Sequence, residues 1–282
     1  MTEVKEIMSS PIAAIHTSDN VANARNLMLR NGISRLGVID GEGRLKGIVT
    51  KKDLAERINQ SEPQWRRRPI DKIPIANVMT PQPITIGPDT PIMEAAAIML
   101  DSNISGLIVG KEKPEGIVTK HDLVRYFTKV GCPLRVGDMM SHNVVTVSRH
   151  HTINSIINMM EENNVDRVVV TDGLETNAYI GMITLDDLGF VEINPREVKD
   201  IKDARKDSAA GRKKYRAVRQ VMLVAEDVMA SPLIYARNDQ KADEAAKIMV
   251  ENNFDMLPVI DGKILGQFAI ENILKWLSEA PE

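Results

Sequence analysis

A hydroxyl and a carboxylate recur three residues apart at three places in this 282-residue chain. At the first turn of a helix, such a pair can form a capping box, in which the two side chains bond free backbone N–H groups. The same groups suit a nucleotide, because a helix N-terminus attracts phosphate and a carboxylate can accept two hydrogen bonds from the cis-diol of a ribose. The spacing alone leaves both interpretations open. The pairs are Thr50 with Asp53, Thr119 with Asp122, and Thr184 with Asp187.

Cationic side chains follow two of these threonines. Lys51 and Lys52 come after the first, and Lys120 and His121 come after the second. The helix dipole disfavours positive charge in the first turn, so these cations cost stability unless an anion offsets them. A phosphate group bound at the helix start is one such anion. The residue types therefore favour an anionic ligand at the first two copies.

Arginine holds an equivalent position in two places, Arg35 in ISRLGV and Arg167 in VDRVVV. Gly106 and Met256 hold that position in the other two copies of the pattern. The guanidinium group presents a fork of donors that suits phosphate. A surface arginine at the end of a strand is the alternative, and the residue type does not decide between the two.

The threonine and the aspartate belong to a seven-residue phrase that recurs along the chain. The fourth copy departs from it, because Ala269 replaces the threonine and Asn272 replaces the aspartate. We expect this copy to lose both polar groups and to have no ribose clamp. In the third copy, Asp186 stands where the first two copies have Lys52 and His121, so we expect that copy to place phosphate differently or to bind it more weakly. The copies read GIVTKKD (47–53), GIVTKHD (116–122), GMITLDD (181–187) and GQFAIEN (266–272).

A larger unit, also repeated four times, must position these phrases. Each unit reads as strand, helix, strand, strand and helix, with an Asp-Gly turn between two strands at 40–41 and at 261–262. We expect the first helix of each unit to end at an equivalent glycine or asparagine, because both residues tolerate the left-handed conformation. These residues are Gly32, Asn103, Asn164 and Asn253. The predicted repeats span 4–58, 75–128, 136–192 and 225–279, and a charged linker spans 193–224. A unit of about 55 residues buries little surface alone, so we expect the repeats to pack in pairs.

This combination of features resembles the CBS domain family. Units that begin near VMTPQPITI and close with the repeated phrase before a helix are similar to that domain. Four of them resemble the four-CBS proteins that include the gamma regulatory subunit of AMP-activated protein kinase and its archaeal stand-alone relatives. The resemblance implies an α/β (α+β) fold of four βαββα repeats, packed as two tandem pairs (Bateman modules) in a flattened disk. It also implies a non-catalytic sensor that binds AMP, ADP or ATP in clefts between paired repeats and is read by a protein partner.

The resemblance further assigns roles to the residues that match the family's motif. The ribose would be held by Asp53, Asp122 and Asp187. The residues beside the ribose and the phosphates would be Thr50, Thr119, Thr184, Lys51, Lys120, Arg35 and Arg167. The adenine slot would be lined by Ile12, Ile84 and Val144, with Leu233 as the equivalent in the fourth copy. The chain would act as a monomeric four-repeat disk or as a homodimer.

Several other classes of protein fit the sequence poorly. The net charge of −3 gives no basic field for nucleic acid, and the single cysteine, Cys132, excludes an intrachain disulfide. The adjacent His150 and His151 do not share a helix face, so we predict no metal site. There is no nucleophile–base set, P-loop or dinucleotide fingerprint, which argues against catalysis. No apolar run approaches the ~18 residues of a membrane span, and the first residues lack a signal core, so we expect a cytoplasmic protein.

Three alternatives stay open. A nucleic-acid-linked regulator could use the basic residues between Lys199 and Arg219 together with QWRRRP (64–69), although a solvated linker is the plainer interpretation. A structural scaffold would use the threonine–aspartate pairs only to cap helices. A sensor of another adenosyl ligand, such as S-adenosylmethionine, is also compatible with the family resemblance.

Overall fold

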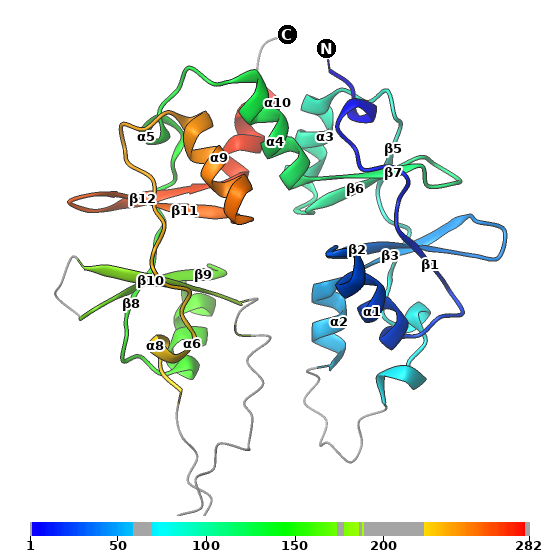
Figure 1. The fold of residues 1–282 in the computed structure, drawn as a ribbon, viewed down its shortest axis with the longest axis horizontal. Helices are drawn as coiled ribbons and strands as arrows, with labels where there is room; N and C mark the ends of the chain where they lie inside the picture. The colour runs from blue at the N-terminus through cyan, green and yellow to red at the C-terminus, as the bar shows by residue number, and fades with distance from the viewer. Residues whose placement is uncertain (1, 59–68, 174–177, 186–187, 189–222, 280–282) are drawn as a thin grey trace, which may run out of the picture. The chain divides into compact units, whose positions relative to one another are not determined.

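The computed structural model describes residues 2–58, 69–173, 178–185, 188 and 223–279 (Figure 1). By its internal contacts the chain divides into two compact units. Unit 1 comprises Met1–Asn143 and Ile234–Glu282, and unit 2 comprises Val144–Leu233. Asp187, residues 193–222 of the charged linker and residues 64–68 of the basic QWRRRP segment lie outside the described residues.

Unit 1 holds the whole of repeats 1 and 2, which have the predicted order of elements. In each, a short first strand runs parallel to the second strand, which forms an antiparallel hairpin with the third. Repeat 1 comprises η1 (Val4–Glu6), β1 (Ala14–His16), α1 (Val21–Asn31), β2 (Arg35–Ile39), β3 (Leu45–Thr50) and α2 (Lys51–Ile58). Repeat 2 comprises η2 (Ile70–Lys72), η3 (Ile75–Asn77), β4 (Thr80–Pro81), β5 (Thr85–Ile86), α3 (Ile92–Asp101), β6 (Gly106–Val109), β7 (Gly116–Thr119) and α4 (Lys120–Val130).

Repeats 3 and 4 follow the same plan where the structure describes them. In repeat 4, a single parallel bridge between Ala236 and Val259 takes the place of the first strand. Repeat 3 comprises α5 (Val136–Met139), β8 (Thr146–Ser148), α6 (Ile153–Asn163), β9 (Arg167–Thr171) and β10 (Tyr179–Thr184). Repeat 4 comprises α8 (Ala225–Val228), α9 (Ala242–Asn252), β11 (Met256–Asp261), β12 (Lys263–Ala269) and α10 (Ile270–Glu279).

The first long helix of every repeat ends at a residue in the left-handed conformation, as the sequence predicts. The cost of a positive φ is small for glycine and tolerable for asparagine, which explains the choice of residue at these four places. The φ angles are 63° at Gly32, 49° at Asn103, 52° at Asn164 and 55° at Asn253. The alignment of the four repeats is therefore confirmed by backbone conformation.

In each repeat, the segment before the first strand pairs with the sheet of a partner repeat. Repeats 1 and 2 exchange these segments with each other, and repeats 3 and 4 do the same, which agrees with two tandem pairs. The backbone bridges that define the exchange join Ser9 with Ile117, Thr80 with Ile48, Ser141 with Gln267, and Ala230 with Met182.

This exchange explains the glycine that opens every copy of the repeated phrase. A Cβ atom on Gly47 would lie 2.7 Å from Sδ of Met79 and 2.8 Å from the carbonyl oxygen of Thr80. The other three glycines meet an incoming methionine and backbone in the same way: Gly116 meets Met8, Gly181 meets Met229, and Gly266 meets Met140. The fourth copy therefore keeps its glycine for packing, although it has lost the threonine and the aspartate.

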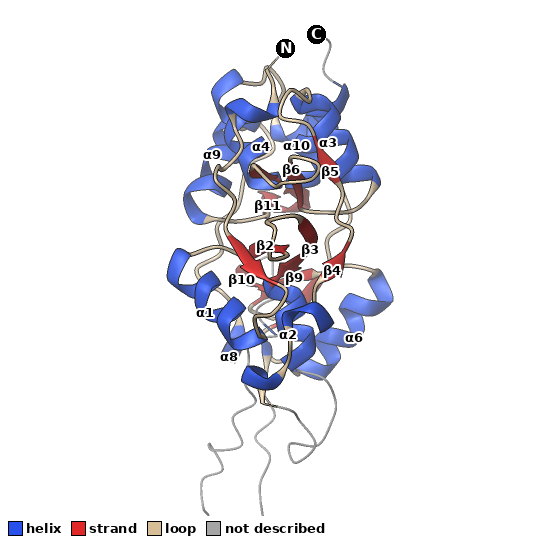
Figure 2. Cartoon of the chain, turned by 90° about the vertical axis from the view of Figure 1, so that its right-hand side faces the viewer, coloured by secondary structure: helices blue, strands red, loops and turns tan. Residues whose placement is uncertain are grey.

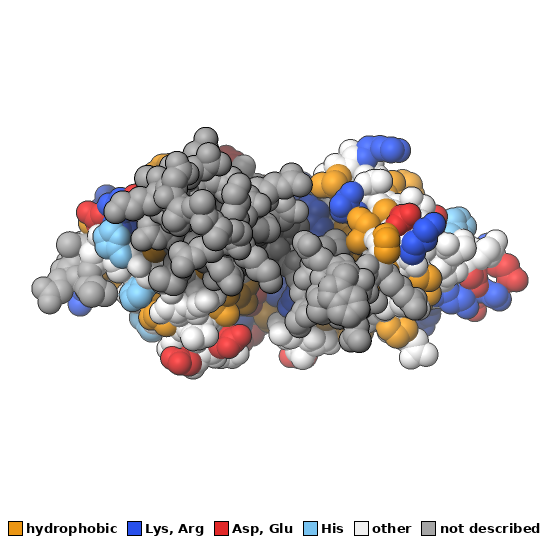
Figure 3. All heavy atoms as spheres, turned by 90° about the horizontal axis from the view of Figure 1, so that it is seen from below, with side chains coloured by type: hydrophobic (Ala, Val, Ile, Leu, Met, Phe, Trp, Pro, Cys, Tyr) orange, Lys and Arg blue, Asp and Glu red, His pale blue; other side chains and the backbone are white. Residues whose placement is uncertain are grey.

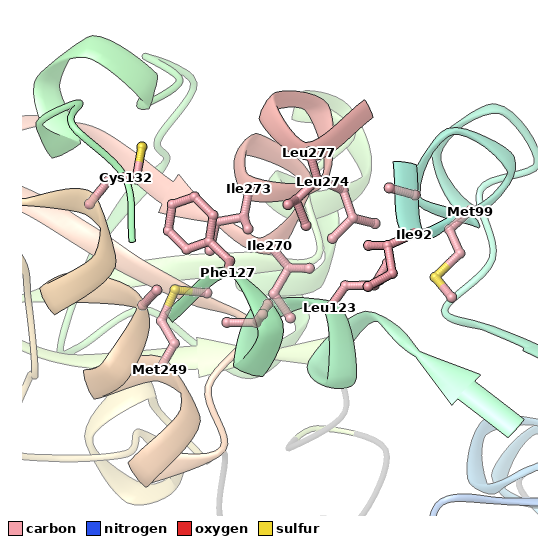
Figure 4. Close-up of a cluster of buried hydrophobic side chains, with 14 of the residues drawn as sticks. Ile92, Met99, Leu123, Phe127, Cys132, Met249, Ile270, Ile273, Leu274 and Leu277 are labelled. Atoms are coloured by element: carbon pink, nitrogen blue, oxygen red, sulfur yellow. The ribbon is translucent and has the colours of Figure 1, made fainter. Parts of the chain in front are cut away.

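Repeats 2 and 4 share one hydrophobic core, built by helices α3, α4, α9 and α10 within unit 1 (Figure 4). Figure 2 shows these four helices gathered together. The rings of Phe127 on α4 and Trp276 on α10 make an edge-to-face contact, with centroids 5.2 Å apart. Repeats 1 and 3 have cores of their own. Among the described residues, no helix has the length and apolar character that crossing a membrane requires.

Candidate functional site

The predicted capping boxes are present at the starts of α2 and α4. In repeat 1, Thr50 Oγ1 accepts a hydrogen bond from Asp53 N at 3.2 Å and donates one to Asp53 Oδ2 at 2.8 Å. The backbone N–H of Thr50 donates to the same carboxylate oxygen at 2.7 Å. In repeat 2, Thr119 and Asp122 make the same three bonds at 3.4, 2.7 and 2.9 Å. In each box, the hydrogen bonds that the aspartate carboxylate accepts from the threonine go to one oxygen, Oδ2.

The other carboxylate oxygen distinguishes the two boxes. Oδ1 of Asp53 has no hydrogen-bond partner among the described residues. Oδ1 of Asp122 accepts a hydrogen bond from Nη1 of Arg125, one turn along α4, at 2.7 Å. The side chain of Asp122 is 7% exposed and that of Arg125 is 56% exposed, so the arginine can leave at little cost. A ribose hydroxyl could therefore bond Asp53 directly but would have to displace Arg125 from Asp122.

Arg35, at the start of β2 in repeat 1, lies at the helix start of repeat 2. Its Nη1 donates to the carbonyl oxygen of Ser105 at 2.8 Å, and its Nη2 donates to Ser105 Oγ at 2.9 Å. The same carbonyl oxygen accepts the N–H of Lys120, the first residue of α4, at 3.2 Å. Burial is the larger effect and holds the pKa of Arg35 below its ordinary value, while the nearby carboxylates of Asp122 and Asp255 partly offset that effect. One repeat thus supplies a guanidinium to the threonine–aspartate box of the other.

Gly106 makes room for this arginine. It holds the same position in repeat 2 that Arg35 holds in repeat 1. A Cβ atom on Gly106 would lie 3.0 Å from Nη1 of Arg35. A side chain at both positions would therefore crowd the junction of the two repeats.

The cations at the start of α4 face acidic residues of repeat 4. Lys120 Nζ donates to Glu271 Oε1 at 2.8 Å, and the lysine side chain is only 13% exposed. His121 Nε2 lies 3.3 Å from Asp255 Oδ1, but without hydrogen-bond geometry, so this buried nitrogen has no hydrogen-bond partner among the described residues. The cost of positive charge at this helix start is thus offset within the protein itself.

The cations at the start of α2 differ from those of α4. Lys51 and Lys52 are exposed, and neither forms an ion pair with any residue in the described part of the chain. Among the residues that the structure describes, their unfavourable position in the first turn has no such offset. An anion near Thr50 would provide one. Within the described part of unit 1, repeat 1 therefore presents the more open of the two boxes.

The fourth copy of the phrase keeps one of the two capping side chains. Asn272 Oδ1 accepts a hydrogen bond from the backbone N–H of Ala269 at 2.8 Å. The expectation that this copy loses both polar groups is wrong, because an amide oxygen caps a helix start as a carboxylate does. The asparagine nevertheless brings no negative charge, and the alanine brings no hydroxyl. Repeat 4 keeps the cap without an anionic group for a diol.

In repeat 3 only part of the predicted site is described. Thr184 ends β10, and the N–H of Leu185 donates to the carbonyl oxygen of Asp166 at 2.8 Å, as Lys120 does to Ser105 in repeat 2. Arg167 bonds the carboxylate of Asp166 through Nε at 2.6 Å and Nη2 at 2.8 Å. Asp187 lies outside the described residues, so its role stays a prediction.

The residues predicted to line an adenine slot differ in exposure. Ile12 lies against β2, where its Cδ1 would be 3.1 Å from a Cβ on Gly37. Ile84 is 43% exposed, whereas Val144 and Leu233 are half-buried. The structure places Ile12 on the sheet of repeat 1, and the adenine role of these residues stays a prediction.

The sequence-based prediction did not include four residues at the site of repeat 2: Ser105, Arg125, Asp255 and Glu271. The alignment of the repeats contained a signal for two of them. Asp255 holds the position of Ser105 in its repeat, and Glu271 holds the position of His121. The fourth repeat thus carries acids where the second carries a serine and a histidine, but only the packing of α4 with α10 shows that these groups meet.

A comparison with protein-family models matches the CBS domain at residues 4–60, 75–129, 136–188 and 224–279. Among curated proteins, MJ1404 of Methanocaldococcus jannaschii is 26% identical over 283 residues, which cover 98% of this chain and 62% of that protein. The chain thus spans less than two thirds of the length of that relative. MJ1225 of the same organism is 23% identical over 291 residues, which cover 98% of each chain.

Among solved structures, that of MJ1225, a proposed archaeal homologue of γ-AMPK, has a TM-score of 0.72 at 20% identity and covers 98% of this chain and 99% of its own. This likeness shows the four-repeat fold. The CBS domain pair of protein MJ0100, in complex with 5′-methylthioadenosine and S-adenosyl-L-methionine, is 31% identical, covers 46% of this chain and 98% of its own, and has a TM-score of 0.41.

Proposed function

The chain belongs to the CBS domain family, and from this premise we propose that it is a non-catalytic regulatory protein that binds AMP, ADP or ATP between paired repeats. One observation carries the proposal. Arg35 of repeat 1 reaches the helix start of repeat 2, where Thr119 and Asp122 already form their box. A guanidinium from one repeat and a hydroxyl–carboxylate pair from the other therefore lie near one helix start, an arrangement that supports a nucleotide bridging the two repeats.

In this proposal each carboxylate both caps a helix and holds a ribose. The ribose residues are Asp53, Asp122 and Asp187, and the phosphate side is served by Thr50, Thr119, Thr184, Lys51, Lys120, Arg35 and Arg167. Asp53 keeps Oδ1 free among the described residues, and Lys51 has no ion pair there. We therefore expect the site of repeat 1 to fill at lower ligand concentration than that of repeat 2.

A thermal-shift panel of AMP, ADP, ATP, NAD, S-adenosylmethionine and GTP tests the proposal. A ligand at about 100 times its Kd adds about 2.7 kcal/mol to the free energy of unfolding, which is a measurable rise in melting temperature. If none of these compounds raises the melting temperature, the proposed function is wrong.

The substitution Asp53→Asn separates ligand binding from capping. Asn272 shows that an asparagine can cap this helix start, so the variant keeps the fold and loses the anionic group. We expect about a tenfold or greater loss of affinity at repeat 1, the weight of hydrogen bonds to a charged acceptor. Asp101→Asn, an exposed acid at the end of α3, is the matched control and should leave affinity unchanged. A lower melting temperature with unaltered affinity in Asp53→Asn would mean that the box serves only to cap the helix.

Charge favours a nucleotide over S-adenosylmethionine as the ligand. The groups that surround the boxes include Arg35, Lys51 and Lys52, all of which attract phosphate. S-adenosylmethionine carries a sulfonium cation and no phosphate. We therefore expect AMP or ATP to bind more tightly than S-adenosylmethionine in the same panel.

The nucleic-acid alternative rests on a segment that lies largely outside the described residues. On the face that Figure 3 shows, the described Lys and Arg side chains are interspersed with Asp and Glu. Binding to DNA or RNA that weakens steeply with salt and disappears when Lys199–Arg219 are neutralised would favour this alternative. We propose instead that a protein partner reads the ligand-bound state in the cytoplasm, with the chain acting as a monomer or a homodimer.

A further inference from the structure

Two acids of repeat 4 face Lys120 and His121 at the start of α4 in repeat 2. Glu271 bonds Lys120 at 2.8 Å, and Asp255 approaches His121 to 3.3 Å. Glu271 begins α10 at the position that Lys52 and His121 hold in their own repeats. Repeat 4 therefore carries an acid at the position where repeat 2, whose helix it meets, carries a histidine and repeat 1 a lysine.

The contact between these charges is fixed by the shared core of repeats 2 and 4. Helices α4 and α10 pack directly on each other, and Phe127 meets Trp276 in that core. The start of α10 is anchored by Ile270, which is 2% exposed, so the backbone at Glu271 is held beside the start of α4. The lysine side chain is 13% exposed and that of Glu271 is 53% exposed, so the pair is only partly shielded from water. A partly shielded charge interaction is somewhat stronger than one between two fully exposed side chains.

We propose that Glu271 and Asp255 act as internal counter-charges that lower the affinity of the repeat 2 site for the phosphate groups of its ligand. This inference rests on the proposed function, because it takes Lys120 as a phosphate-binding residue. A phosphate that bonds Lys120 either displaces Glu271 or lies close to its carboxylate, and both arrangements cost free energy. Repeat 4, which lacks its own anionic clamp, thereby sets the charge preference of repeat 2.

A regulatory consequence follows from the same contact. A ligand that takes Lys120 from Glu271 weakens a polar link between the first turns of α4 and α10. Because coupling free energies are reciprocal, whatever loosens that link also favours the ligand. The site of repeat 1 has no counterpart to these acids among the described residues, since Lys51 and Lys52 form no ion pair there. The two sites thus differ in charge preference although their motifs are alike.

The test is Glu271→Gln, which keeps the size of the side chain and removes its charge. It is made in the background Asp53→Asn with Asp187→Asn, so that only the repeat 2 site is read. Isothermal titration calorimetry with AMP, ATP and adenosine then gives three affinities. We expect the affinity for AMP to rise about two- to fivefold, as removal of one partly exposed ion pair allows, and that for ATP to rise further. Adenosine, which has the same base and ribose but no phosphate, should bind with unchanged affinity.

Two further variants keep the result interpretable. Glu279→Gln removes an exposed acid at the other end of α10 and should leave all three affinities as they were. Asp255→Asn should act in the same direction as Glu271→Gln, and it gives a second reading if Glu271→Gln lowers the melting temperature. An equal rise for adenosine and AMP would show that the change loosens the fold and would overturn the inference. A fall in AMP affinity would overturn it as well, because Glu271 would then be holding Lys120 in place for the ligand.

Failure of the proposed function is distinguishable from failure of this inference. If AMP binds but Glu271→Gln and Glu279→Gln give equal affinities, the inference is wrong and the proposed function stands. If no nucleoside or nucleotide binds any variant, the proposed function is wrong, and inorganic tripolyphosphate takes the place of ATP in the titration. Tripolyphosphate must then bind more tightly to Glu271→Gln than to Glu279→Gln, and equal binding overturns the inference.

Discussion

The Thr119 hydroxyl makes two hydrogen bonds at the start of α4. It accepts one from the N–H of Asp122 and donates one to that residue's carboxylate. The hydroxyl thereby satisfies a backbone donor that has no partner within the helix, and it also fixes the rotamer of the carboxylate. The orientation of the group that would meet a ribose thus depends on the capping contact. The capping and ligand-binding interpretations of this motif are compatible for that reason.

Replacing this hydroxyl tests the energetic side of the box. We expect Thr119→Val to lower the free energy of unfolding by about 1 kcal/mol, because the N–H of Asp122 loses its acceptor. A thermal melt monitored by circular dichroism measures the change. Thr128→Val, later on the same helix, is the control, since that hydroxyl bonds only the carbonyl of Arg125 beyond the first turn. Equal melting temperatures for the two variants would argue against a stabilising box at Thr119.

At the scale of the helices and strands, local rules explain much of the fold. The ends of the first long helices follow from glycine and asparagine alone, and the antiparallel hairpins follow from apolar runs joined by turn residues. These features depend on a few consecutive residues. A single sequence therefore reveals them.

The exchange of segments between repeats does not follow from such rules. Ser9 pairs with Ile117 through one backbone bridge, although more than a hundred residues separate them in the chain. A two-residue strand such as β4 carries no periodic pattern, so nothing local marks it. The glycine of the repeated phrase gave a hint, because a strand glycine indicates a close backbone approach. It did not indicate which segment approaches.

Gly47 offers a direct test of the exchange. Gly47→Ala places a methyl group 2.7 Å from Sδ of Met79 and 2.8 Å from the backbone oxygen of Thr80, and the backbone cannot yield as a side chain can. We expect a loss of about 1–3 kcal/mol in the free energy of unfolding, the range for overpacked sites. Gly41→Ala, in the turn that precedes the same strand, is the control, since no neighbouring atom lies within 4 Å of its Cβ position. If both variants melt alike, the segment around Met79 does not pack on β3 as described.

At the scale of the whole chain, the similar repeats differ in the groups around their helix starts. Among the described residues, repeat 1 keeps an open box, repeat 2 has a box whose charges are already paired, and repeat 4 keeps a cap without an anion. The motif predicted the members of the boxes, because Thr50, Asp53, Thr119 and Asp122 lie where the spacing puts them. It could not predict their charge partners. Glu271 and Asp255 reach Lys120 and His121 only through the packing of repeat 4 on repeat 2, a contact between distant parts of the chain.

That packing predicts that repeats 2 and 4 unfold as one cooperative body. Phe127→Ala removes the ring that meets Trp276 and leaves a cavity between α4 and α10, at an expected cost of about 3–5 kcal/mol. Hydrogen exchange followed by mass spectrometry should show α4 and α10 losing protection together, although Trp276 and its helix belong to a different repeat. Helix α1, which packs in the separate core of repeat 1, should keep more of its protection. Val130→Ala, also on α4 but 55% exposed, should change neither helix. If α10 keeps its protection while α4 loses it, the two repeats are held together by something other than this core, and the Lys120–Glu271 contact would have to be supported by other residues.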